Sequence, residues 1–170
     1  RYLTTDATKY LVQALVISRL DYCNSLLYGI SKKLIRKLQD VQNTAARVVT
    51  HTRRYEHIEP VRKMLHWLPV HRRIQFKILV LTYRSLHGTA PLYLAEKLDW
   101  YQPPRTLRSQ DKLLLVEPGS NLKTFGDKNF IKAAPHLWNS LPYDIRAAPT
   151  LSAFRSALKT HYFRLEYESM

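Results

Sequence analysis

The chain is poor in cysteine, glycine and acidic residues, and each shortage excludes a class of protein. Its 170 residues include one cysteine, Cys23, which excludes a disulfide framework and a cysteine-rich zinc site. There are 4 glycines, and no glycine-rich phosphate loop is present. The 13 Asp and Glu residues are dispersed, so no neighbouring carboxylate pair is placed to hold two magnesium ions for phosphoryl transfer. These shortages argue against independent catalysis.

Long apolar runs are also missing. The longest clearly apolar stretch without a charge runs from Tyr10 to Ser18, far shorter than the roughly 20 residues that a helix needs to cross a bilayer. Leu, Ile, Val and Phe nevertheless exceed the roughly 20% of residues below which a charged chain usually stays disordered. We therefore expect a folded protein without a membrane partner. Because the helical pattern is already under way at Arg1, we also expect the chain to belong to a longer polypeptide.

Positive charge is abundant and evenly spread. The chain has 27 Lys and Arg residues and a net charge of +14. Residues 1–50 carry 8 cationic side chains and 3 carboxylates, residues 51–100 carry 9 and 4, and residues 101–170 carry 10 and 6. A folded domain this basic attracts polyanions, and nucleic acid is the commonest of these partners. A soluble basic protein with solvated lysines is the alternative.

The first hundred residues have the periodicity of helices. A cap at Thr4 to Asp6 predicts a first helix that ends at Gly29 and carries Cys23 in its core stripe. A second helix is predicted after Ser31, with a polar face that includes Lys33, Lys37 and Arg47, and with a core stripe made of Leu34, Leu38, Val41, Ala45 and Val48. Further helices are predicted over residues 58–66, 70–87 and 91–98.

The pattern changes after residue 98. Prolines 103 and 104 indicate a linker, and the apolar run at residues 113–116 predicts a strand, so we expect a minor β pair near residues 105–117. Helices return after Gly126, with Pro135 predicted to start a new helix and a final amphipathic helix from Leu151 to Leu165. We therefore predict a mostly α fold, with a helical bundle over residues 1–98 and a smaller helical unit over residues 99–170.

Histidines and tryptophans are assigned to packing or to the basic surface. Pro69 separates His66 from His71, so these two side chains cannot share one regular helical face, and no Cys or acidic cluster joins them. We predict no metal site, no cofactor and no small-molecule substrate. Trp67 and Trp138 could stack on unpaired bases, but packing is the favoured interpretation because both lie in apolar motifs.

Several ordered motifs resemble one family. They are residues 18–29 (SRLDYCNSLLYG), 34–50 (LIRKLQDVQNTAARVVT), 65–70 (LHWLPV), 73–77 (RIQFK), 82–88 (TYRSLHG), 105–109 (RTLRS) and 133–142 (AAPHLWNSLP). Together they resemble the segment that follows the polymerase palm in LINE-type, jockey-like non-LTR retrotransposon reverse transcriptases. The resemblance covers about residues 1–163, and the sequence lacks both the Asp-Asp metal motif of the palm and the Cys/His knuckle of some relatives.

The resemblance implies a helical thumb followed by a C-terminal domain. Such a segment of an RNA-directed DNA polymerase is expected to hold the template–primer or the element RNA during target-primed reverse transcription. It would not be an enzyme by itself, and no catalytic residue is assigned. Its implied partners are RNA or DNA and the palm of the parent polypeptide, and its implied location is intracellular, in the nucleus and cytoplasm as a ribonucleoprotein.

Phosphate contacts are expected to fix the position of the nucleic acid and to carry little sequence information. The expected contact residues lie on the second helix, in the basic connector that follows it and at the start of the helix predicted over residues 70–87: Lys33, Arg36, Lys37, Arg47, Arg53, Arg54, Arg72 and Arg73. Two alternatives stay open. The chain could be a protein-interaction scaffold that docks on a missing palm, or a decayed standalone remnant.

Overall fold

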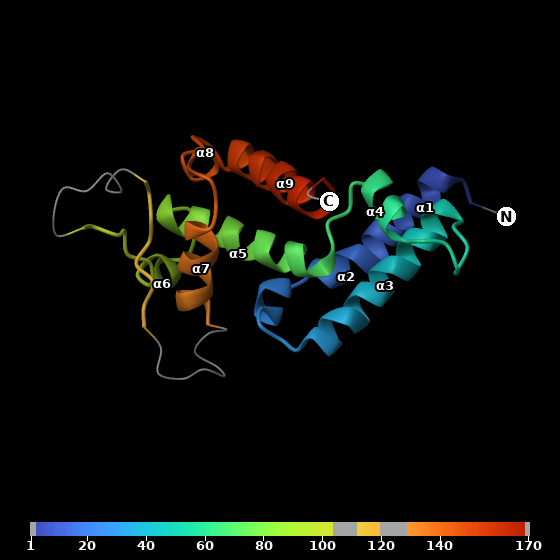
Figure 1. The fold of residues 1–170 in the computed structure, drawn as a ribbon, viewed down its shortest axis with the longest axis horizontal. Coiled ribbons are helices and arrows are strands. Elements are labelled where there is room, and N and C mark those ends of the chain that lie inside the picture. The colour runs from blue at the N-terminus through green and yellow to red at the C-terminus, as the bar shows by residue number, and fades with distance from the viewer. Residues whose placement is uncertain (1–2, 104–111, 120–128, 169–170) are drawn as a thin grey trace. The chain divides into compact units, whose positions relative to one another are not determined.

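Helices dominate residues 3–103, 112–119 and 129–168, which are the residues that the computed structural model describes (Figure 1). This described part contains no sheet, so the expected mostly α fold is confirmed. Its helical elements are α1 (Thr5–Val12), a π-helical turn (Gln13–Ile17), α2 (Ser18–Asp21), a 3-10 turn (Asn24–Leu27), α3 (Lys32–Thr50), α4 (Glu59–Met64), α5 (Val70–Leu86), α6 (Leu92–Ala95), α7 (Phe130–Asn139), α8 (Tyr143–Arg146) and α9 (Leu151–Tyr167).

Two compact units divide the chain. Unit 1 contains Arg1–Ile74 together with Tyr162–Met170, and unit 2 contains Gln75–His161. Helices α5 and α9 therefore each contribute residues to both units. The sequence predicts one domain over residues 1–98 and another over residues 99–170. That is a statement about independent folding and not about compactness, so it stays a prediction.

The first predicted helix ends earlier than its periodicity indicates. Thr4 caps α1 as expected, because its Oγ1 accepts a hydrogen bond of 3.2 Å from the backbone N–H of Ala7. Regular α-helix ends at Asp21, and Cys23 then adopts the left-handed region with φ 49°. This backbone turn breaks the apolar stripe before Gly29 and leaves Cys23 exposed. The prediction that Cys23 is a core residue is therefore wrong.

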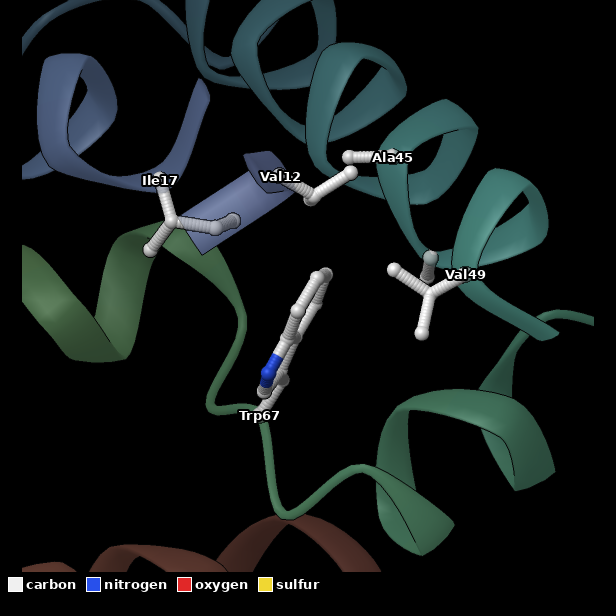
Figure 2. Close-up of a cluster of buried hydrophobic side chains, with 6 residues drawn as sticks. Val12, Ile17, Ala45, Val49 and Trp67 are labelled. Carbon is white, nitrogen blue, oxygen red and sulfur yellow. The ribbon is translucent and has the colours of Figure 1, made fainter. Parts of the chain in front are cut away.

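The core of unit 1 forms around Trp67. Its indole ring lies among apolar side chains of α1, the π-helical turn and α3 (Figure 2), namely Val12, Ile17, Ala45 and Val49. Trp67 is 7% exposed, so the packing interpretation of this tryptophan is confirmed. Helices α1 and α3 pack on each other, and α4 packs on α3 (Figure 1).

Helix α3 turns a different side to the core from the one that its apolar stripe predicts. The helix begins after Ser31 as expected. Its buried residues, however, are Gln42, Ala45, Ala46 and Val49. Of the predicted stripe, Ala45 is buried as expected, whereas Leu34, Val41 and Val48 are exposed. Gln42 is polar although it faces the core. Its Nε2 donates a hydrogen bond of 2.9 Å to the carbonyl oxygen of Leu68, which satisfies both groups.

The end of α9 is fixed within unit 1. Tyr167 donates from its hydroxyl to the carbonyl oxygen of Trp67 at 2.7 Å, and Lys63 Nζ donates to the carbonyl oxygen of Tyr167 at 3.3 Å. Phe163 lies with its ring centroid 5.4 Å from that of His66. The last turns of α9 thus complete a core that residues 12–70 begin.

Aromatic rings build the core of unit 2. Phe154 of α9 stacks with Tyr83 of α5 at 4.6 Å between ring centroids and with Trp138 of α7 at 5.7 Å. Trp138 is fully buried, as its packing interpretation predicts. The Tyr83 hydroxyl donates to the carbonyl oxygen of Ala148 at 2.9 Å, so the polar tip of this buried ring is satisfied.

A side chain of α7 holds the segment at residues 113–117. Asn139 accepts a hydrogen bond from the backbone N–H of Leu115 and donates one to its carbonyl oxygen, both at 2.9 Å. Trp138 Nε1 also donates to the carbonyl oxygen of Leu113 at 2.8 Å. In the described part of the chain this segment forms one isolated antiparallel bridge, between Trp100 and Leu115, and no strand. Much of the expected β pair, residues 104–111, lies outside the described residues.

Pro135 lies inside a helix, although the sequence predicts that it begins one. Helix α7 starts at Phe130, where Asn129 caps it, and continues to Asn139. A proline at this position removes the hydrogen bond to the carbonyl group of Ile131. Its ring is fully buried, as is that of Trp138 three residues later. Packing of α7 therefore offsets the lost bond.

Candidate nucleic-acid interface

The first two turns of α3 carry a group of cationic side chains. Lys33, Arg36 and Lys37 are exposed, and Lys32 precedes them. Successive residues of a helix turn by about 100°, which places Lys33, Arg36 and Lys37 within one sector of about 100°. No ion pair joins these three to any residue of the described chain. We name Lys33, Arg36 and Lys37 the α3 cation cluster.

Local structure at the start of α3 adds to this positive charge. Ser31 occupies the cap position but makes no side-chain hydrogen bond to the helix, and the first turn contains no acidic residue. The N-terminal end of a helix carries a partial positive charge from its aligned peptide dipoles. Cations there repel that partial charge, so the helix itself does not stabilise the α3 cation cluster.

Arg47, at the other end of α3, anchors the connector that follows the helix. Its Nη1 donates to the carbonyl oxygen of Arg53 at 2.8 Å, and its Nη2 donates to that of Glu56 at 3.0 Å. The Glu56 carboxylate in turn accepts from the backbone N–H of Arg53 at 3.1 Å. The guanidinium group that the sequence assigns to a binding face is therefore also a structural element of the loop.

Arg53 and Arg54 lie in that connector. Arg53 donates from Nη1 to the Tyr55 hydroxyl at 2.7 Å, and its guanidinium carbon lies 6.0 Å from the centroid of the Tyr55 ring. Arg54 is exposed, with no hydrogen bond or ion pair from its side chain to the described residues. Arg47, which binds this connector, lies 11 residues along α3 from Arg36, so at about 1.5 Å per residue the second cationic site is roughly 16 Å along the helix from the α3 cation cluster.

Two of the expected residues form ion pairs within unit 1. Arg73 donates to both carboxylate oxygens of Asp21, from Nε to Oδ1 at 2.8 Å and from Nη2 to Oδ2. Arg72 Nε lies 3.4 Å from Glu166 Oε2, and its guanidinium group sits over the ring of Tyr162 at 5.2 Å. Both cations are thus partly neutralised by carboxylates.

His71 shares Glu166 with Arg72. His71 Nε2 lies 3.5 Å from Glu166 Oε2. Burial lowers the pKa of His71, and the charges of Arg72 and Arg62 lower it further, while Glu166 raises it. His71 is therefore predominantly neutral at pH 7 and adds little positive charge to this face.

The structure thus brings three of the eight expected residues together at the start of α3, and the other five lie elsewhere in unit 1. Lys33, Arg36 and Lys37 form one cluster, while Arg53 and Arg54 form another. The engagement of Arg72 and Arg73 was not visible from the sequence, because Asp21 lies 52 residues from Arg73 and Glu166 lies 94 residues from Arg72.

Among the described residues, no group of three or more His, Cys, Asp or Glu side chains is placed to hold a metal ion. Within the same part of the chain, every helix is too short or too polar to span a bilayer.

Three comparisons were made with known proteins. No family model, curated protein or solved structure matches the chain. The chemistry of the exposed cations is therefore the structural basis for a functional assignment.

Proposed function

We propose that the chain binds nucleic acid through phosphate contacts centred on the α3 cation cluster. The observation that carries this proposal is the group Lys33, Arg36 and Lys37, exposed on one face and without a carboxylate partner in the described chain. Arg53 and Arg54 supply a second contact region. The net charge of +14 adds long-range attraction for a polyanion.

In this proposal the chain is the non-catalytic C-terminal part of a LINE-type reverse transcriptase. The motifs of the sequence support this role, with the helical bundle predicted over residues 1–98 acting as the thumb. Its task is to hold the template–primer or the element RNA, and the palm of the parent polypeptide supplies the polymerase carboxylates. The resulting ribonucleoprotein would occur in the nucleus and the cytoplasm.

The test measures binding of fluorescent RNA hairpin, RNA–DNA hybrid and DNA duplex as a function of salt. If the protein neutralises about 5–8 phosphates, the logarithm of its affinity should fall with the logarithm of the salt concentration at a slope of about −4 to −7. Replacing Lys33, Arg36 and Lys37 by Glu should lower affinity for all sequences alike and reduce the slope by about three. Folding should persist, because all three side chains are exposed and acidic residues are favourable near the N-terminal end of a helix.

A matched control separates local contacts from total charge. Lys97, Lys112 and Lys159 are exposed cations of unit 2 without side-chain partners among the described residues. Replacing these three by Glu also lowers the net charge from +14 by six, to +8. The control variant should retain most of the affinity and the slope. Equal losses in both variants, or no binding by the wild-type chain in about 50 mM salt, would contradict the proposed site.

A further inference from the structure

The exposed members of the apolar stripe of α3, Leu34, Val41 and Val48, form an outer seam at the edge of the core. Together with Leu38 and the buried Ala45 they are spaced alternately by four and three residues, which is the spacing of a coiled-coil seam. Leu34, Val41 and Val48 are 49%, 47% and 50% exposed. The seam spans about 21 Å along the helix.

A groove lies along this seam within unit 1. It is formed between α3 and the region of α1 and the π-helical turn, and it has a volume of about 450 Å³. Its lining is mostly apolar and consists of Val12, Val16, Asp40, Val41, Thr44, Ala45 and Val48. The Thr44 hydroxyl donates to the carbonyl oxygen of Asp40 at 2.9 Å, so its proton is already used. We name this feature the α1–α3 groove.

The lining of the groove selects a helix as its occupant. An extended segment placed against valine and alanine side chains would leave backbone N–H and C=O groups without partners, which is costly. A helix satisfies these groups internally, and a straight seam with a seven-residue repeat matches the side-chain rows of a second helix.

The charges beside the groove select an acidic helix. Lys33 and Lys37 lie on the side of α3 next to Leu34 and Val41, within about 100° of the seam. In a coiled-coil register with Val41 at d, Lys37 takes a g position, where charge sets partner choice. A second copy of the chain would bring the same cations into contact, and like charges oppose such pairing.

We propose that the α1–α3 groove binds an amphipathic helix of a protein partner, with acidic side chains flanking its apolar stripe. The apolar stripe packs on the exposed Val41 and Val48, and the acidic flank pairs with Lys33 and Lys37. The acidic flank uses Lys33 and Lys37, which the proposed function assigns to phosphate, whereas the apolar contacts involve none of those cations, so a change at Val41 and Val48 tests this inference separately from nucleic-acid binding.

The test uses a synthetic three-heptad peptide as the probe, with Leu at a and d and Glu at e and g. A second peptide replaces each Glu by Lys, and a third keeps the composition but moves the leucines off the stripe. Binding to the full chain is measured by fluorescence anisotropy. The Glu peptide should bind, and the Lys peptide should bind at least about tenfold more weakly. The third peptide should not bind.

Two protein variants test the two halves of the contact. Val41→Ser with Val48→Ser should weaken binding of the Glu peptide about tenfold, since two half-exposed valines lose their burial. The control is Leu92→Ser with Tyr93→Ser in unit 2, where both side chains are exposed, and it should bind as wild type does. Lys33→Glu with Lys37→Glu should reverse the preference towards the Lys peptide.

Specific outcomes would overturn the proposal. The groove is not the site if Val41→Ser with Val48→Ser leaves binding of the Glu peptide unchanged, or if the third peptide binds as well as the first. The occupant is a second copy if sedimentation shows a dimer that the serine variant abolishes. It is a lipid surface or a nucleic acid if the same variant selectively loses binding to phosphatidylserine vesicles or to RNA.

Discussion

Gln42 donates from its side-chain amide to the backbone carbonyl oxygen of Leu68 at 2.9 Å, and both residues are buried. Gln39, one turn earlier, donates to Gln42 Oε1 at 2.8 Å and accepts from the backbone N–H of Val70 at 2.9 Å. Two glutamines of α3 therefore satisfy backbone groups on both sides of Pro69. This arrangement fixes the rotation of α3 and turns its outer seam away from the core.

Replacing Gln42 by Met should destabilise the chain although it makes the core more apolar. The change keeps the side-chain length but leaves the buried carbonyl group of Leu68 without a donor. We expect the free energy of unfolding to fall by about 1–3 kcal/mol, measured by urea denaturation. Val41→Met, one residue away and exposed, should change it by no more than about 0.5 kcal/mol. A Gln42→Met variant as stable as wild type would show that this hydrogen bond contributes no net stability.

Stability should fall at high pH because of Tyr167. Burial raises the pKa of Tyr167 to about 12, whereas tyrosine in an unfolded chain has a pKa of about 10. The contribution of this hydroxyl is complete below about pH 10 and is lost as the pH rises towards 12, because only the protonated form is accommodated in the fold.

The comparison variant is Tyr167→Phe, which has no proton to lose at this position. Unfolding measured in urea at several pH values should show a steeper loss of stability between about pH 10 and pH 12 in wild type than in Tyr167→Phe. Tyr10→Phe, which changes an exposed ring, should behave as wild type does. Parallel pH curves for wild type and Tyr167→Phe would mean that the hydroxyl does not couple ionisation to folding.

Arg73 should contribute mainly to folding, and Lys37 mainly to binding. Asp21→Asn removes the carboxylate that accepts both hydrogen bonds of Arg73, and it should lower the free energy of unfolding by about 1–2 kcal/mol. Arg73→Gln should cost a similar amount, and the double variant should cost less than the two separate losses together, because they remove the same interaction.

Binding measurements complete this comparison. Lys37→Gln should leave stability within about 0.5 kcal/mol of wild type and reduce the salt slope by about one. Arg73→Gln should show the opposite pattern, with lower stability and a slope changed by less than one. A larger slope change for Arg73→Gln than for Lys37→Gln would move the phosphate contacts away from the α3 cation cluster.

Asn139→Asp should loosen the segment at residues 113–117 in a pH-dependent way. A carboxylate can still accept from the backbone N–H of Leu115 but cannot donate to its carbonyl oxygen. It would also face the carboxylate of Glu117, whose Oε1 accepts from Asn139 at 3.1 Å in the wild-type chain. The fold therefore disfavours the ionised form, so the loss of stability should be larger at pH 7 than near pH 4.

Thermal unfolding at the two pH values measures this effect. We expect Asn139→Asp to cost about 2–4 kcal/mol at pH 7, because a donor is lost and like charges meet. Asn129→Asp is the matched control, since an acidic cap at the start of α7 is favourable and should change stability little. An equal cost for Asn139→Asp at both pH values would show that charge at this position is not felt by the fold.

Local signals determined the helices that the sequence predicts best. Thr4 caps α1, Ser31 precedes α3, and the apolar pattern from Val70 onward becomes α5, which ends two residues before Gly88. Each signal acts over one or two helical turns, so it can be identified without knowing what the helix packs against. Where a local feature opposed the pattern, the pattern failed: Cys23 takes a left-handed backbone conformation within a stripe that predicts a continuous helix.

The sequence by itself determined a basic, mostly helical protein with its cations spread along the chain, because charge and periodicity are properties of the residues alone. Tertiary structure decided which cations remain available to a ligand. Arg73 and Arg72 pair with Asp21 and Glu166, which are distant in the sequence, while Lys33 and Lys37 stay exposed. It also decided which side of α3 is buried, since the hydrogen bond between Gln42 and Leu68 joins residues 26 positions apart. Contacts of this range depend on how the helices pack, and a periodicity of three or four residues contains no information about them.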